Sequence, residues 1–178
     1  MATVWAQAAG HGRFTMALGG HVVLVPVPGS DPVRRARWVG GRLAWCLKEI
    51  GLAAEVWPVL QRQYAVRKSA FSPAGERPSL SEHYNSFAIE RGAWSPAQTG
   101  CGCPLGANGL RLTLVDDVVT RGRTLLAAAA RLREAFPAAE IRAFALLRTL
   151  ARNETLYGLL DPRQGEVRWI AGDARRTL

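Results

Sequence analysis

The chain is poor in several features, and each scarcity excludes a class of protein. Its 178 residues include only three cysteines, an odd and sparse set that argues against a disulfide-stapled secreted fold. No apolar run reaches the roughly 18 residues that a transmembrane helix needs, so we predict no membrane span. The first residues lack a basic stretch followed by an apolar core, so we predict no signal peptide and a cytoplasmic protein.

Lysine is also scarce. Lys48 and Lys68 are the only two, and neither lies in a Gly-x-x-x-x-Gly-Lys-Ser/Thr loop, which excludes a P-loop nucleotide hydrolase. The net charge is nevertheless +9, carried almost wholly by arginine. Such a charge would favour binding to nucleic acid or to a substrate with several phosphate groups. A bias in genomic base composition would also explain the many arginines. We favour the last two over nucleic acid.

The segment 111–124 carries the strongest functional signal. Leu112 to Val115 is an apolar run typical of a buried strand, and Asp116 and Asp117 follow it directly. Carboxylates there would lie at the carboxyl edge of a sheet, where open α/β sheets bind ligands. The turn 120–124 then offers hydroxyls, a glycine and free backbone N–H groups at a helix start, which together suit an anion. This combination fits the hydroxyls and the phosphate of a ribose 5-phosphate.

A purely structural role for the two acids is the alternative. Asp116 and Asp117 could simply cap the following helix. Two carboxylates about 4 Å apart repel each other by on the order of 4 kcal/mol at an effective dielectric constant near 20. A hydroxylated ligand or a cation would offset that repulsion, so we favour a binding role.

These residues resemble the phosphoribosyl pyrophosphate (PRPP) binding motif of type I phosphoribosyltransferases. The motif reads Leu-Thr-Leu-Val-Asp-Asp-Val-Val-Thr-Arg-Gly-Arg-Thr here, with Arg121 in place of the common second Thr. The resemblance implies one domain over residues 1–178, an α/β fold with a central parallel sheet of about five strands flanked by helices, and a small hood. It also implies that Asp116 and Asp117 contact the ribose hydroxyls as the catalytic pair. The residues implied for the 5-phosphate are Thr120, Arg121, Gly122, Arg123 and Thr124.

A second resemblance lies upstream. The segment His21-Val-Val-Leu-Val-Pro-Val-Pro28, followed by basic residues, is similar to the ComF-like branch of that family. The zinc-binding Cys-x-x-Cys head of that branch is missing, and Asn85-Ser86-Phe87 is one residue short of its Asn-x-x-Phe region. Cys101 and Cys103 could bind a metal or form a redox switch, but no further cysteine or nearby histidine supports either role. These departures leave the acceptor open.

Alternating strands and helices indicate a parallel sheet with right-handed crossovers. The expected strands are 22–27, 55–60, 87–90, 111–116, 141–147 and 167–170. We expect one helix with Asp31 as its N-cap and Pro32 at its first position, and we expect it to stop at Gly51. A second helix should follow Gly122 and end before Pro137.

Residues 61–84 read as a long flexible loop, and loops of this length in compact domains are usually functional or disordered. The resemblance implies a loop that closes over the active site and excludes water. Lys68 and Arg77 are candidates for binding pyrophosphate, although a solvated surface loop is the alternative. His83 is a candidate general base, and the alternative is that it is a solvent-exposed loop histidine without a role in catalysis.

The turn after the strand 22–27 offers a second anion cradle. Its candidate pyrophosphate ligands are Gly29, Ser30, Arg34 and Arg35, unless the arginines only cap a surface helix. The expected activity is transfer of ribose 5-phosphate from PRPP to a nucleobase-like nitrogen acceptor, with Mg²⁺ bound through the substrate and Asp116 and Asp117 as candidate direct ligands. The alternative is a regulator of this fold that binds PRPP or a nucleotide and nucleic acid without catalysis. The resemblance also implies a homodimer.

Overall fold

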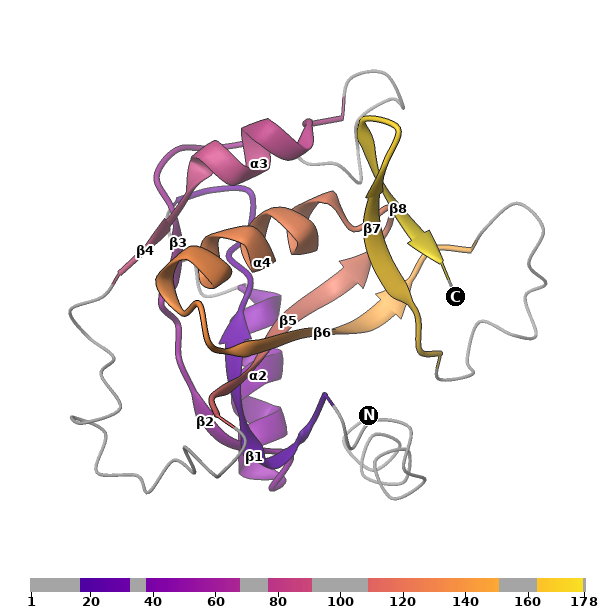
Figure 1. The fold of residues 1–178 in the computed structure, drawn as a ribbon. Coiled ribbons are helices and arrows are strands. Elements are labelled where there is room, and N and C mark those ends of the chain that lie inside the picture. The colour runs from indigo at the N-terminus through magenta and orange to yellow at the C-terminus, as the bar shows by residue number, and fades with distance from the viewer. Residues whose placement is uncertain (1–16, 33–37, 68–76, 91–108, 151–162, 178) are drawn as a thin grey trace.

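A four-stranded parallel sheet forms the centre of the molecule. The computed structural model describes residues 17–32, 38–67, 77–90, 109–150 and 163–177. The sheet has the order β2–β1–β5–β6, with β1 at Gly19–Pro26, β2 at Ala53–Val56, β5 at Arg111–Val119 and β6 at Glu140–Arg148 (Figure 1). All three pairings are parallel. The predicted α/β class is therefore confirmed, with four strands in this sheet, within the described ranges, rather than about five.

Two helices cover the two faces of the sheet, and the alternation of side chains along β1 explains how. Val23 and Val25 belong to the core cluster that includes α4 (Arg123–Ala135), whereas Val22 and Leu24 belong to the cluster that includes α2 (Val39–Glu49). Successive residues of a strand point to opposite faces, so one apolar run supplies both cores. Each core is thus shared between the sheet and one helix.

The strand order reverses between β1 and β5. β1 lies between β2 and β5, so the connection that follows β1 leads to one side of the sheet and the connection that follows β5 leads to the other. In open α/β sheets, ligands bind at the carboxyl ends of the strands where this reversal occurs. The turn at Gly29–Ser30 follows β1 and the turn 120–124 follows β5. The two predicted anion turns therefore follow the two strands at which a ligand is expected.

The predicted loop 61–84 is partly wrong. Its start belongs to β3 (Leu60–Arg62), which pairs antiparallel with β4 (Phe87–Ile89), and its end forms α3 (Leu80–Ser86). Ser79 caps α3 in a capping box with Glu82, a Ser-x-x-Glu pattern that is legible in the sequence. Residues 68–76 lie outside the described part. Pro58 likewise separates β2 from β3, where one strand was expected over 55–60, because proline lacks a backbone N–H.

Helix α2 is the described part of the predicted N-terminal helix. α2 starts at Val39 with Trp38 at its N-cap, and the expected start of the helix falls on residues 33–37, which are not described. The indole Nε1 of Trp38 donates a hydrogen bond of 2.8 Å to the carbonyl of Val27. This bond holds the start of α2 against the end of β1.

A C-terminal hairpin packs beside the ends of β5 and β6 (Figure 1). It comprises β7 (Glu166–Ile170), which was predicted over 167–170, and β8 (Asp173–Thr177), which was not predicted. The Arg176 guanidinium donates to the carbonyl of Thr149 at 2.7 Å and to that of Val119 at 3.3 Å. No helix in the described ranges is long and apolar enough to cross a membrane.

Candidate functional site

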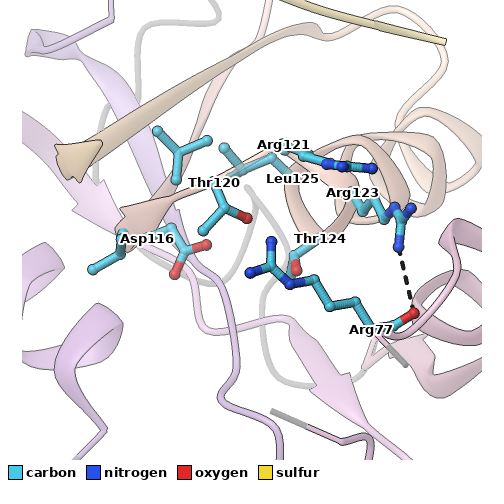
Figure 2. Close-up of a pocket in the computed structure, with 10 residues that line it drawn as sticks. Arg77, Asp116, Thr120, Arg121, Arg123, Thr124 and Leu125 are labelled. Atoms are coloured by element: carbon cyan, nitrogen blue, oxygen red, sulfur yellow. Dashed lines mark hydrogen bonds between the residues drawn. The ribbon is translucent and has the colours of Figure 1, made fainter. Parts of the chain in front are cut away.

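The turn between β5 and α4 lines a small, solvent-open pocket. The pocket contains most of the site predicted from the sequence, and Figure 2 shows seven of its ten lining residues by name. The predicted residues that line it are Arg77, Asp116, Thr120, Arg121, Gly122, Arg123 and Thr124. Residues from β5, from the turn and from the chain before α3 therefore meet in one place.

Gly122 gives the turn its shape. It is the N-cap residue of α4 and has φ 88°, a left-handed conformation that side chains disfavour. A Cβ atom at this position would lie 2.6 Å from Cγ1 of Val167 on β7. Glycine is thus required both by the backbone and by the hairpin packed against it. The packing role was not predicted, because β7 is more than forty residues away in sequence.

The acidic pair lies inside β5 rather than at its end. β5 continues through Val118 and Val119, which pair with Leu147 and Arg148 of β6. Asp116 lines the pocket, whereas Asp117 is not among the pocket's lining residues. Burial, followed by the charge of Asp117, raises the pKa of Asp116 to about 7. A cation or a hydroxylated ligand in the pocket would therefore favour the charged form of this carboxylate.

Arg121 and Arg123 both bind Asp173 of the hairpin. Arg123 donates from Nε at 2.5 Å and from Nη2 at 2.8 Å, a bidentate contact, and Arg121 donates from Nη1 at 2.7 Å. These hydrogen bonds, with that of Arg123 contributing most, hold the pKa of Asp173 well below its usual range. Arg123 Nη1 also donates to the carbonyl of Pro78 at 3.0 Å. Both arginines thus fasten neighbouring segments to the turn.

The pyrophosphate candidates separate into two groups. Arg77 lines the pocket, and Figure 2 shows its side chain extending past Thr124 toward Asp116 and Thr120. Gly29 and Ser30 lie in the turn after β1, where the carbonyl of Ser30 accepts a hydrogen bond of 2.8 Å from the N–H of Val66. Arg34, Arg35 and Lys68 lie outside the described residues.

A buried arginine that was not predicted links the turn after β1 to α3. Arg62 of β3 is 6% exposed, and its Nε donates to the carbonyl of Gly29 at 2.7 Å. Its Nη1 donates to Ser86 Oγ, its Nη2 to His83 Nδ1 at 3.1 Å, and its guanidinium lies 4.2 Å from the ring centroid of Phe87. Burial lowers the pKa of Arg62 to about 10, while the charge of Asp116 acts in the opposite direction. The only sequence signal is that Arg62 lies two residues after the apolar segment 56–60.

His83 is buried, so the expectation of a solvent-exposed loop histidine is wrong. It is 3% exposed on α3, and its Nε2 lies 3.5 Å from Thr124 Oγ1. Burial, followed by the positive charge of Arg62, lowers the pKa of His83 to about 4. The imidazole is therefore neutral near pH 7 and too weakly basic for efficient general-base catalysis there.

The described part of the chain offers no metal site built from protein side chains alone. It contains no group of three or more His, Cys, Asp or Glu residues that could hold an ion. Asp116 and the neighbouring Asp117 instead suit a hard cation such as Mg²⁺, which takes one or two carboxylates and completes its shell with substrate oxygens and water. Cys101 and Cys103 lie outside the described residues.

Comparisons of the chain with protein-family models, curated proteins and solved structures found no significant match.

Proposed function

We propose that this protein is a phosphoribosyltransferase that uses PRPP and Mg²⁺ to transfer ribose 5-phosphate to a nitrogen acceptor, with release of pyrophosphate. One observation carries the proposal. Asp116 and the turn 120–124 line the same pocket, at the carboxyl end of β5, where open α/β sheets bind ligands. That pocket combines a carboxylate for sugar hydroxyls with an anion-binding turn, as a ribose 5-phosphate requires.

The 5-phosphate would bind in the turn. The free N–H groups at the start of α4 and the positive end of the helix dipole favour an anion, by about 0.3–2 kcal/mol. The hydroxyls of Thr120 and Thr124 also line the pocket and add hydrogen-bonding groups. Arg121 and Arg123 are engaged by Asp173, so they contribute charge at the rim rather than direct contacts.

The reaction is a substitution at ribose C1. The lone pair of the acceptor nitrogen forms the new bond to C1 while the bond from C1 to the pyrophosphate oxygen breaks, and pyrophosphate leaves with the bonding electrons. The acceptor nitrogen then loses its proton. Positive charge develops on the ribose ring, as in glycoside cleavage, and the carboxylate of Asp116 would stabilise it.

Bound Mg²⁺ would neutralise the negative charge of the leaving pyrophosphate. Asp116 is the side chain placed to meet such a cation from the floor of the pocket, with Asp117 next to it in β5. A cation there would lower the raised pKa of Asp116 and keep it charged near neutral pH.

Pyrophosphate would lie toward β1. Arg77 extends into the pocket from the chain before α3, and the carbonyl of Gly29, in the turn after β1, accepts a hydrogen bond from Arg62. Lys68, Arg34 and Arg35 remain predicted contributors, and a homodimer remains a prediction.

The test is release of pyrophosphate from PRPP in the presence of Mg²⁺ and a panel of purine, pyrimidine and other nitrogen acceptors. We expect release with at least one acceptor, and a loss of about 100-fold or more in Asp116→Asn. Glu49→Gln is the matched control, because it removes one exposed carboxylate at the far end of α2. Equal loss in both variants, or no release with any acceptor, would count against the proposal.

The hairpin favours the regulatory alternative as a second candidate. It exposes Trp169, which is 53% accessible, on one face, and the exposed pair Arg168 and Arg175 projects from the opposite face. An exposed aromatic ring suits stacking on a base of single-stranded nucleic acid, and exposed arginines suit its phosphates. Binding of an oligonucleotide that weakens steeply with salt, without pyrophosphate release, would favour this function.

A further inference from the structure

We propose that Arg62 and His83 are positioning residues that fix the hydroxyl of Thr124 as a hydrogen-bond donor into the pocket. The site would then favour a ligand that presents only acceptor oxygens at this point, such as a phosphate monoester. This inference rests on the proposed function, because it concerns the group that binds in the turn 120–124. It does not require that the protein catalyse a reaction.

The first step concerns Arg62. A guanidinium carries five N–H donors and no acceptor. Its Nη2 lies 3.1 Å from His83 Nδ1, so Nδ1 must accept the bond through its lone pair. Ser86 Oγ does not take the place of Nδ1 as the acceptor for Nη2. It already accepts a hydrogen bond from Nη1 of the same guanidinium and donates one to the carbonyl of His83 at 2.7 Å. The arginine therefore determines which nitrogen of the imidazole is unprotonated.

The second step concerns the proton of His83. A neutral imidazole with an unprotonated Nδ1 carries its hydrogen on Nε2. The charged groups that face the ring in the described structure are Arg62 from β3, Arg123 from α4 and Glu82 from α3. Two of the three are positive and the ring is buried, so the neutral form is favoured. His83 thus presents a single N–H donor toward α4.

The third step concerns Thr124. Its Oγ1 is 3.5 Å from Nε2 of His83, and the Nε2–H donor makes this oxygen the acceptor of the bond. The hydroxyl hydrogen of Thr124 must then point elsewhere, and Thr124 lines the pocket (Figure 2). A donor aimed at a charged phosphate oxygen forms a strong, charge-assisted hydrogen bond.

The tautomer can be measured directly. Long-range proton–nitrogen correlation spectra of the ¹⁵N-labelled protein distinguish the two ring nitrogens of His83. We expect a protonated Nε2 and an unprotonated Nδ1 in the wild type, with loss of this preference in Arg62→Met. A hydrogen on Nδ1 in the wild type would overturn the relay, whatever the protein binds.

Two substitutions at His83 separate its two nitrogens. The amide nitrogen of His83→Gln reaches the position of Nε2 and retains the donor to Thr124, whereas the oxygen of His83→Asn replaces only Nδ1. We expect His83→Asn to bind ribose 5-phosphate about tenfold more weakly than the wild type, and His83→Gln to stay within about threefold. Equal affinity of these two variants would contradict the relay.

Thr124 provides the second pair. We expect Thr124→Val to lose about tenfold in affinity for ribose 5-phosphate and Thr124→Ser to retain it, because only serine keeps the hydroxyl. Adding His83→Asn to Thr124→Val should cause little further loss, since both changes remove the same interaction. Additive losses would overturn the relay. If the relay holds but PRPP yields no pyrophosphate, only the proposed catalytic function fails.

Discussion

Two groups of arginines near the pocket are held in opposite ways. Arg62, which does not line the pocket, is 6% exposed and bonds to a backbone carbonyl, a hydroxyl and an imidazole. At the rim of the pocket, Arg121 and Arg123 share the carboxylate of Asp173, and the side chain of Arg121 is 52% exposed. Neutral partners thus hold Arg62, whereas a carboxylate holds the two arginines at the rim.

This difference shows that the number of charges near a site says little about their importance. A buried donor that loses its partner pays the full cost of desolvation, about 1–3 kcal/mol for each group. An exposed ion pair such as Arg121–Asp173 contributes about 0–1 kcal/mol and is screened by salt. Arg62 should therefore contribute more to stability and geometry than Arg121 does.

The largest expected effect is at Arg62. Arg62→Met leaves the Gly29 carbonyl, Ser86 Oγ and His83 Nδ1 without their donor. We expect it to lower the free energy of unfolding by about 3 kcal/mol in urea titrations. Arg121→Met on the rim is the matched control and should cost less than about 1 kcal/mol. Similar costs for both variants would remove the distinction between the buried arginine and the arginine at the rim.

Gly122 tests the contact between the turn and the hairpin. Gly122→Ala should cost about 2 kcal/mol, because alanine disfavours φ 88° and its Cβ would overlap Val167. In a protein that already carries Val167→Ala, the change Gly122→Ala should cost less than it does in the wild type, because the smaller side chain leaves room for the new Cβ. Thermal unfolding of the wild type, the two single variants and the double variant measures both costs. If the effects of the two changes simply add, the hairpin does not pack against this glycine.

The pH dependence of stability tests Asp116. Folding raises its pKa from 3.8 to about 7, so the folded state keeps a proton that the unfolded state has lost. The wild type should therefore lose stability as the pH rises from about 4 to about 7. Asp116→Asn avoids this penalty and should be about 2 kcal/mol more stable than the wild type at pH 8.

The lowered pKa of His83 gives the opposite trend, with stability lost as the pH falls from 6.5 toward about 4. The wild type and Asp116→Asn both contain His83, so its contribution cancels in the difference between their free energies of unfolding. A stability difference that does not change with pH would show that the pKa of Asp116 is not raised.

The smallest expected effect is at Asp173. Asp173→Asn removes the charge that Arg121 and Arg123 share, and we expect a loss of about 0.5–1 kcal/mol at low salt. The loss should shrink in 1 M NaCl, where the Debye length is about 3 Å. A loss that persists at high salt would mean that the hydrogen bonds rather than the charges hold the hairpin.

The parallel sheet and the pocket floor could be predicted because their signals are local. Val22 to Val27 and Leu112 to Val115 are apolar runs that read as buried strands, and the acids and the turn follow the second run directly. The confirmed α/β class and the shared pocket of Asp116 and the turn 120–124 follow from these short patterns.

The rest of the site depends on contacts between distant segments, which no local pattern contains. Arg62 meets Gly29 across 33 residues, and Arg123 meets Asp173 across 50. The periodicity of a single segment could not reveal either pair. Helix α3 was not predicted for a different reason. Its capping box, Ser79 with Glu82, is a local signal, but it lies within the segment 61–84 that was expected to be a loop.

The most direct test of the account is a calorimetric titration of PRPP into the protein, with and without Mg²⁺. It should be performed on the wild type, on Asp116→Asn/Asp117→Asn and on the control Glu49→Gln. We predict binding that requires Mg²⁺, is lost in the double variant and is retained in the control. Failure of the wild type to bind PRPP, or equal binding by the double variant, would contradict the assignment of this pocket.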